Sequence, residues 1–133
     1  MSDIGSFWSQ RSPVLLSLLR IVAAFLFMQH GAQKILGWPG AGDHTVELAS
    51  LMGVAGCLEL FGGGLLLLGL FTRPVAFLLS GEMAFAYFMA HAPQGFWPVL
   101  NQGEAAVLYC FVFLYLSAAG GGPLSLDRVL RKT

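Results

Sequence analysis

The stretch AAVLYCFVFLYLSAAGGGPLSL, residues 105–126, contains no charged side chain. A bilayer core about 30 Å thick is crossed by roughly 20 apolar residues of helix, so this stretch is long enough to span one. The whole chain is similar, with 56% hydrophobic and 11% charged residues, whereas soluble domains carry about 25% charge. A soluble core of 133 residues could not hide so much apolar surface. The surplus is therefore expected to face lipid.

Apolar windows of spanning length, bounded by charges or by Gly and Pro, predict four transmembrane helices. They cover residues 14–36, 47–71, 74–92 and 104–119. The first is expected to begin after Pro13, because proline suits the first position of a helix. The segments between them are predicted as loops, and residues 120–133 as a short interfacial tail. The predicted fold class is therefore all-α, an integral membrane four-helix bundle with up-down topology, formed by one domain that covers residues 1–133.

Basic residues predict the orientation of the bundle. The N-terminal flank, the second loop and the tail carry Arg11, Arg73, Arg128, Arg131 and Lys132. The other two loops carry only Lys34, so both termini are expected in the cytoplasm. The formal net charge is zero and no basic block occurs, which argues against nucleic acid as a partner.

Three charged residues, Arg20, Glu59 and Glu82, fall inside the first three predicted spans. Each costs at least about 2.5–3.5 kcal/mol there unless it is paired. At 1.5 Å per residue, Arg20 lies roughly 9 Å and Glu82 roughly 12 Å from the cytoplasmic ends of their helices. These depths predict an Arg20–Glu82 ion pair with Glu59 beside it.

One arginine cannot neutralise two carboxylates, so Glu59 or Glu82 is expected to be protonated or paired elsewhere. A proton-handling site needs a carboxyl in that state, which makes both residues candidates for catalysis. The alternative is that the three charges only hold the helices together. Glu59 also shares a helix face with Gly56 and Gly63, where a neighbouring helix can approach closely.

Polar residues near the outer ends of the helices form a candidate ligand site above these charges. With Arg20, the predicted ligand-binding set is His30, Lys34, Tyr87, His91 and Glu104. A tyrosine at membrane depth can donate to a carbonyl ligand, although an interhelical partner is the commoner role. No metal is predicted, because His30 and His91 have no third ligand at a recognisable spacing.

Several motifs resemble those of a known family. They are LLRIVAAFLFMQHGAQKILG at residues 18–37, GCLELFGGGLLLLGLFTRPVA at 56–76, and the ending GPLSLD at 122–127. Together they resemble the DoxX family of small four-helix bacterial membrane proteins, and the resemblance implies a location in the bacterial inner membrane. The family pattern maps onto Arg20, His30, Gly31, Lys34, Glu59, Gly69, Arg73, Glu82, His91, Glu104, Gly120 and Asp127. The resemblance implies an association with a quinone-linked oxidoreductase, with oxidative-stress complexes or with catabolism of aromatic compounds.

The leading hypothesis is a small subunit of a membrane redox system. Its polar site would hold a quinone or another small phenolic or carbonyl compound, and Glu59 or Glu82 would move a proton. The chain has no CxxC, haem-attachment or nucleotide-binding motif, so no covalent cofactor is expected and electrons would come from a redox partner protein. The alternatives are a membrane scaffold or assembly subunit and a carrier of protons or small solutes, which would require a homo-oligomer.

Overall fold

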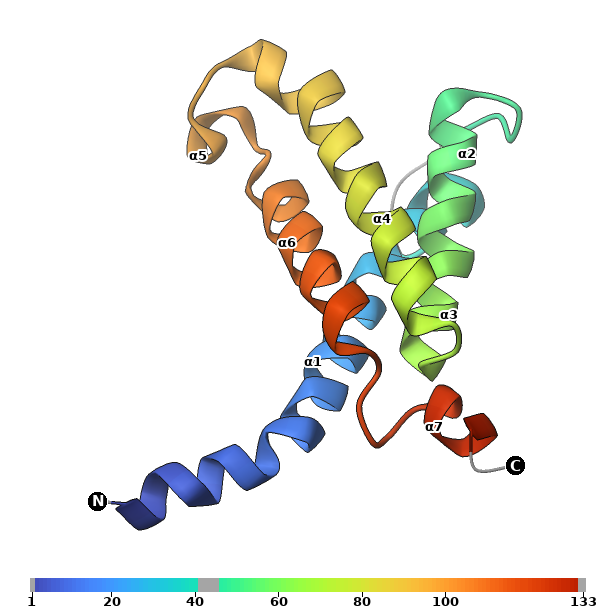
Figure 1. Ribbon diagram of the computed structural model, residues 1–133. Coiled ribbons are helices and arrows are strands. Elements are labelled where there is room, and N and C mark those ends of the chain that lie inside the picture. Colours follow the sequence, from blue (N-terminus) through green and yellow to red (C-terminus); the bar gives the residue numbers. More distant parts are fainter. Residues whose placement is uncertain (1, 41–45, 132–133) are drawn as a thin grey trace.

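The computed structural model describes residues 2–40 and 46–131, and the elements it describes are helical (Figure 1). The first span is α1, Ser2–Leu36. The second consists of α2 (Leu51–Cys57), the π-helical segment η1 (Leu58–Gly62) and α3 (Gly63–Leu68).

The third span begins with α4 (Thr72–Ala86) and continues through the π-helical segment η2 (Tyr87–His91) into the 3₁₀ turn η3 (Ala92–Gln94). The short helix α5 (Pro98–Asn101) leads into the fourth span, α6 (Glu104–Ala119). The last element is α7 (Leu126–Arg131).

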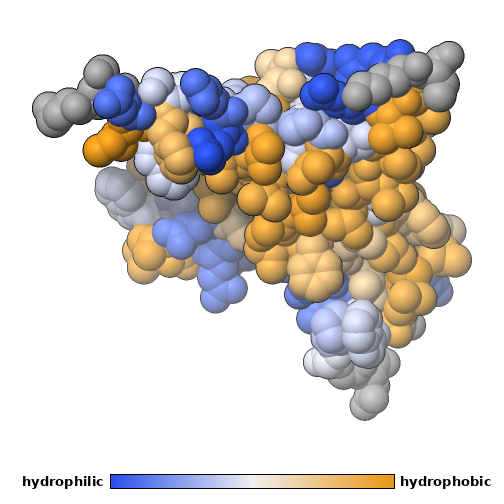
Figure 2. Space-filling model, turned by 90° about the horizontal axis from the view of Figure 1, so that it is seen from below, coloured by the Kyte–Doolittle hydropathy of each residue, from blue (hydrophilic) through white to orange (hydrophobic). Residues whose placement is uncertain are grey.

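The predicted all-α membrane bundle is confirmed. Three helical segments, residues 3–36, 51–68 and 72–94, are long and apolar enough to cross a bilayer, and α6 is a shorter apolar helix. Large side chains point outward from these spans, including Phe77, Phe88 and Phe111, each more than 60% exposed. Figure 2 shows a broad hydrophobic surface with hydrophilic residues toward its edges. Such a surface suits contact with lipid.

The start of the first helix differs from the prediction. Helix α1 begins at Ser2 and contains Pro13 in its interior. A proline removes one helical hydrogen bond, but Arg11 supports the turns before it. The Arg11 guanidinium donates to the Phe7 carbonyl, and its central carbon lies 3.5 Å from the centre of the Phe7 ring. In Figure 1 this exposed N-terminal part runs outward from the bundle. The predicted third loop also contains more helix than expected, in η3 and α5.

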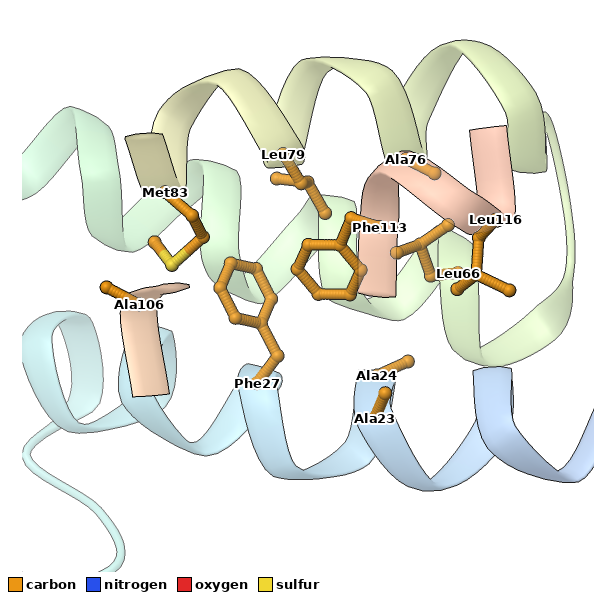
Figure 3. Packing of buried hydrophobic residues seen from close by; sticks show 10 residues of the cluster. All are labelled: Ala23, Ala24, Phe27, Leu66, Ala76, Leu79, Met83, Ala106, Phe113 and Leu116. Atoms are coloured by element: carbon orange, nitrogen blue, oxygen red, sulfur yellow. The ribbon is translucent and has the colours of Figure 1, made fainter. Parts of the chain in front are cut away.

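The centre of the bundle is a compact apolar cluster contributed by all four spans. Figure 3 shows Phe27 from α1 facing Phe113 from α6, with Leu66 and Leu79 nearby. The Phe27 and Phe113 rings meet edge to face, with their centres 4.9 Å apart. This cluster closes the middle of the bundle, so polar residues gather toward its two ends.

Small residues let α1 and the second span touch through their backbones, as the sequence predicted. A Cβ atom at Gly31 would lie 2.5 Å from the Leu60 nitrogen and 2.7 Å from the Gly56 oxygen. Real Cβ atoms do not approach other atoms so closely, so only glycine fits at position 31. This approach positions the last turns of α1 beside Glu59.

The segment after α6 connects α7 to the start of α4. Asp127 in α7 accepts hydrogen bonds from the backbone N–H groups of Phe71 at 2.7 Å and Thr72 at 2.9 Å, so it caps the N-terminus of α4. Burial raises the pKa of Asp127, but these hydrogen bonds and the charge of Arg131 outweigh it, and the pKa lies below its ordinary value of 3.8. The folded state therefore favours the ionised carboxylate.

Replacing Asp127 with asparagine is expected to lower the free energy of unfolding at pH 7 by about 1 kcal/mol, since one acceptor and the charge are lost. A carboxyl with a depressed pKa stabilises the fold above its unfolded pKa and loses that contribution as the pH falls. The deficit of the variant should therefore begin to shrink as the pH falls through about 4, where an unfolded Asp is protonated. It should go on shrinking at lower pH, because the folded carboxyl has a pKa below 3.8 and is protonated later. Unfolding in detergent at a series of pH values checks this, with exposed Asp3→Asn as the control; a deficit that stays constant down to pH 3 would contradict it.

Candidate functional site

The predicted Arg20–Glu82 ion pair is wrong. Arg20 is 1% exposed and its guanidinium donates to the carbonyls of Gly121, of Leu124 at 2.8 Å and of Leu67 at 3.5 Å. The carboxylate whose charge acts on it is Asp127. The depths along the helices agreed, but the segment after α6 turns back into the bundle and offers carbonyls that no helix satisfies. Arg20 is therefore a structural link at the opposite end from the polar site.

The partner of Glu59 is Lys34, which the sequence placed only at the rim. The Lys34 Nζ lies 2.6 Å from Oε1 and 2.7 Å from Oε2 of Glu59. Glu59 is buried, whereas the Lys34 side chain is 24% exposed. Within residues 2–40 and 46–131 this is the one ion pair. Of the two carboxylates, Glu82 is therefore the one without a counter-ion among the described residues.

Both π-helical segments carry a residue of this site. Glu59 lies in η1, and His91 ends η2. A π-helical turn inserts one residue into a helix and shifts the side chains that follow, and such turns are frequent at functional sites. The His91 Nδ1 is 3.0 Å from the Asn101 carbonyl, which orients the imidazole ring.

A cavity of about 250 Å³ lies beside the Lys34–Glu59 pair, and we call it the central cavity. Its polar lining comprises His30 and Lys34 from α1, Glu59, His91, Gln102 and Tyr109 from α6. Phe27 lies at its inner side, with its ring centre 5.3 Å from that of Tyr109. The cavity thus combines aromatic faces, a cation, a carboxylate and donors at its edge, which is the lining that binds small ligands with polar groups.

A larger groove of about 800 Å³ runs between the second and third spans, and we call it the lateral groove. Lys34, Glu59, Ala86 and His91 line both the groove and the central cavity. The rest of the groove is mostly apolar, with exposed side chains such as Phe77 and Met89.

Glu82 lines this groove, and both of its carboxylate oxygens are buried without a hydrogen-bond partner among the described residues. An ionised carboxylate in such a place is costly, so its protonated form suits the site.

The predicted site residues divide into two groups. Glu59, Lys34, His30 and His91 lie together around the central cavity, with Glu82 in the adjoining groove.

Arg20, Tyr87 and Glu104 lie elsewhere. The Tyr87 hydroxyl accepts a 3.3 Å hydrogen bond from Asn101 and helps to order the turn before α6. Glu104 is an exposed residue in the first turn of α6, where a negative charge favours the helix dipole.

Tyr109 is, with Gln102, one of two polar residues of the central cavity that the sequence did not select. It stacks on Phe113, with ring centres 5.6 Å apart, and its ring lies 6.3 Å from that of His30. Helical spacing was the available signal, because Tyr109 falls on the same face of α6 as buried Ala106 and Phe113, whereas Tyr115 does not.

Comparisons with known proteins agree with this architecture. A model of the DoxX family matches residues 15–92. An uncharacterized protein of Haemophilus influenzae is 47% identical over 121 residues, which covers 86% of this chain and 90% of that protein. The inner membrane protein YphA of Escherichia coli is 29% identical over 129 residues, with coverage of 87% and 90%. The Bacillus subtilis protein named "Putative oxidoreductase CatD" is 29% identical over 113 residues, with coverage of 83% and 82%. No solved structure matches the chain significantly.

Proposed function

This chain belongs to the DoxX family, and from that premise we propose that it is a small inner-membrane subunit of a redox system that binds a quinone or a similar phenolic or carbonyl compound. The observation that carries the proposal is the central cavity, in which an ion pair, two histidines and a phenol surround aromatic faces. One relative is named as an oxidoreductase and another as an inner membrane protein, which supports the redox class and the location.

The side chains around the central cavity match the two ends of such a compound. A planar ring fits against Phe27 and Tyr109, and its oxygens accept from the Tyr109 hydroxyl and the Lys34 ammonium. Lys34 is already held by Glu59, so it is fixed in position before a ligand binds.

Glu82 supplies the proton-handling capacity in this proposal. Its oxygens are buried and unpartnered in the lateral groove, and the charge of Glu59 acts on it. A protonated Glu82 can release a proton toward the Glu59–Lys34 pair when a ligand bound beside the pair gains negative charge. The chain supplies no electron carrier motif of its own, so the electrons come from a redox partner protein.

The lateral groove supplies the route of entry. It is apolar, lies between two membrane spans and shares Lys34, Glu59 and His91 with the central cavity. A lipid-soluble compound can therefore reach the ion pair from the bilayer without crossing water. The distribution of arginines supports an orientation with both termini in the cytoplasm.

A scaffold role is the second candidate, and one observation favours it. The Lys34–Glu59 pair links α1 to the second span directly, at a place where glycines bring the two backbones together. Such a pair can specify helix packing without any chemistry.

Labelling with a photoreactive short-chain quinone separates these functions. The full chain in lipid nanodiscs is expected to be labelled within α1, η1 and α6, with competition by the unlabelled quinone. Tyr109→Phe removes one hydroxyl and keeps the ring, so it should weaken binding about fivefold to tenfold, while exposed Tyr115→Phe on the same helix should not change it. The scaffold role would be favoured if the unlabelled quinone does not reduce the labelling, or if Tyr109→Phe and Tyr115→Phe reduce it equally.

A further inference from the structure

A second cavity lies at the opposite end of the bundle from the central cavity. It has a volume of about 460 Å³ and is formed where α1, the start of α4, the segment after α6 and α7 meet, at the bottom of Figure 1. Arg73, Arg128 and Arg131 line it, and no acidic side chain of the described residues does so. We call it the arginine cavity.

The positive charge of this cavity is compensated only in part by the chain, because the charge of Arg131 acts on the Asp127 carboxylate. Arg73 donates to the Ala118 carbonyl, and the Nε of Arg131 donates to the Asp127 carbonyl at 3.3 Å. These carbonyls are neutral. The Arg128 guanidinium makes no hydrogen bond or ion pair within the described ranges. The nearby Asp127 carboxylate is already occupied by the backbone N–H groups of Phe71 and Thr72.

The glycine-rich segment, residues 120–122, forms one wall of the arginine cavity. Gly120 has a φ of 84°, and a Cβ atom there would lie 3.3 Å from the Nη2 of Arg73. A larger residue would be strained by its backbone conformation and would also crowd the guanidinium. The segment therefore passes close to Arg73 and leaves the guanidinium facing the cavity.

The surroundings of the arginine cavity are amphipathic. Pro13, Leu16 and Pro123 form its apolar wall. Beside it, α7 and the segment that precedes it expose Leu124, Leu126 and Val129 together with Arg128. A short helix of this kind lies in the boundary between lipid headgroups and acyl chains. With α7 in that boundary, the cavity would lie at the level of the phosphate groups of the bilayer.

We propose that the arginine cavity binds the phosphate of an anionic phospholipid, with the guanidinium groups of Arg73, Arg128 and Arg131 around the headgroup. Guanidinium groups bind phosphate oxygens with two parallel hydrogen bonds, and basic pockets at the surface of membrane proteins select acidic headgroups. The apolar wall takes the glycerol end of the acyl chains. The proposal does not depend on the redox function and requires only that this end of the bundle lies at a membrane surface.

Lipid retention measured by native mass spectrometry tests the proposal on the full chain in detergent. Phosphatidylglycerol is expected to remain bound in preference to phosphatidylethanolamine with the same acyl chains. Arg128→Gln should weaken phosphatidylglycerol binding about fivefold, and the double variant with Arg73→Gln about twentyfold, since each arginine near an anionic surface contributes about that factor.

Arg11→Gln is the matched control, because Arg11 is also on the predicted cytoplasmic side but its guanidinium pairs only with Phe7 among the described residues. It should leave lipid retention unchanged. If Arg73→Gln prevents folding through the loss of its bond to Ala118, Arg128→Gln carries the test alone. The Arg128 guanidinium makes no hydrogen bond or ion pair with the part of the chain that the structure describes.

Three results would overturn the proposal. They are equal retention of the two lipids, equal losses in Arg128→Gln and Arg11→Gln, and displacement of phosphatidylglycerol by millimolar inorganic phosphate, which would assign the cavity to soluble phosphate.

Discussion

Replacing Arg20 with methionine is expected to destabilise the bundle by about 3–5 kcal/mol, because charge-assisted hydrogen bonds to buried carbonyls are worth about 1.5–3 kcal/mol each. The Gly121 and Leu124 carbonyls would lose their donor in the interior of the protein. The segment after α6 would then detach from α1, and the Asp127 cap on α4 would be lost with it.

Trypsin susceptibility measures this detachment directly. Cleavage after Arg128 should become at least tenfold faster in Arg20→Met, together with a lower free energy of unfolding in detergent. Arg20→Lys keeps the charge but lacks the several N–H donors of a guanidinium. Its cleavage rate and stability should therefore lie between those of the parent protein and of Arg20→Met. Arg11→Met, at an exposed site, should change stability by less than about 0.5 kcal/mol. An Arg20→Met protein whose α7 stays protected would contradict the assignment of Arg20 as the link.

Replacing Glu59 with glutamine is the second change with a large expected effect. It leaves the Lys34 ammonium without its counter-ion in a mostly buried position. Breaking a fully buried pair costs about 3–5 kcal/mol and an exposed pair at most about 1 kcal/mol, so a loss of about 2–3 kcal/mol is expected for this partly exposed lysine. Quinone labelling of the central cavity should also decrease, because Lys34 is no longer fixed.

A double-mutant cycle isolates the pair. Lys34→Gln alone should also destabilise the protein, whereas the combined Lys34→Gln and Glu59→Gln variant removes both charges and should recover most of the stability. Glu104→Gln is the control, since Glu104 is exposed and outside the cavity. If Glu59→Gln is as stable as the parent protein, Lys34 does not depend on Glu59 and the site is held by other contacts.

The spans could be predicted from the sequence because lipid contact demands long apolar runs, and four such runs stand out in this chain. The polar end could also be predicted in outline, since His30, Lys34, Glu59 and His91 are unusual at membrane depth, and they do lie together. A single sequence states how deep a residue lies, but it does not state which faces of two helices meet.

The partners of the charges were missed for that reason. Arg20 and Glu82 have matching depths on helices whose charged faces do not meet, and the acceptors for Arg20 are backbone carbonyls, which leave no mark in a sequence. Tyr87 was predicted as a ligand residue and Tyr109 was not, because only packing shows that Tyr109 faces the central cavity. The η1 and η2 segments are likewise not visible in hydropathy, because one inserted residue changes the periodicity only locally.

The link between Arg20 and the glycine-rich segment bears on how the protein is made. Helix α1 leaves the ribosome first, but two of the three carbonyls that receive its arginine belong to residues synthesised 101 and 104 positions later. At about 5–20 residues per second, Arg20 waits roughly 5–20 seconds for them, in or beside a bilayer that penalises a lone charge. Arg20 therefore gains its full set of acceptors only when the final part of the chain has been synthesised. A ribosome that stops early leaves an exposed charge that quality-control proteases can recognise.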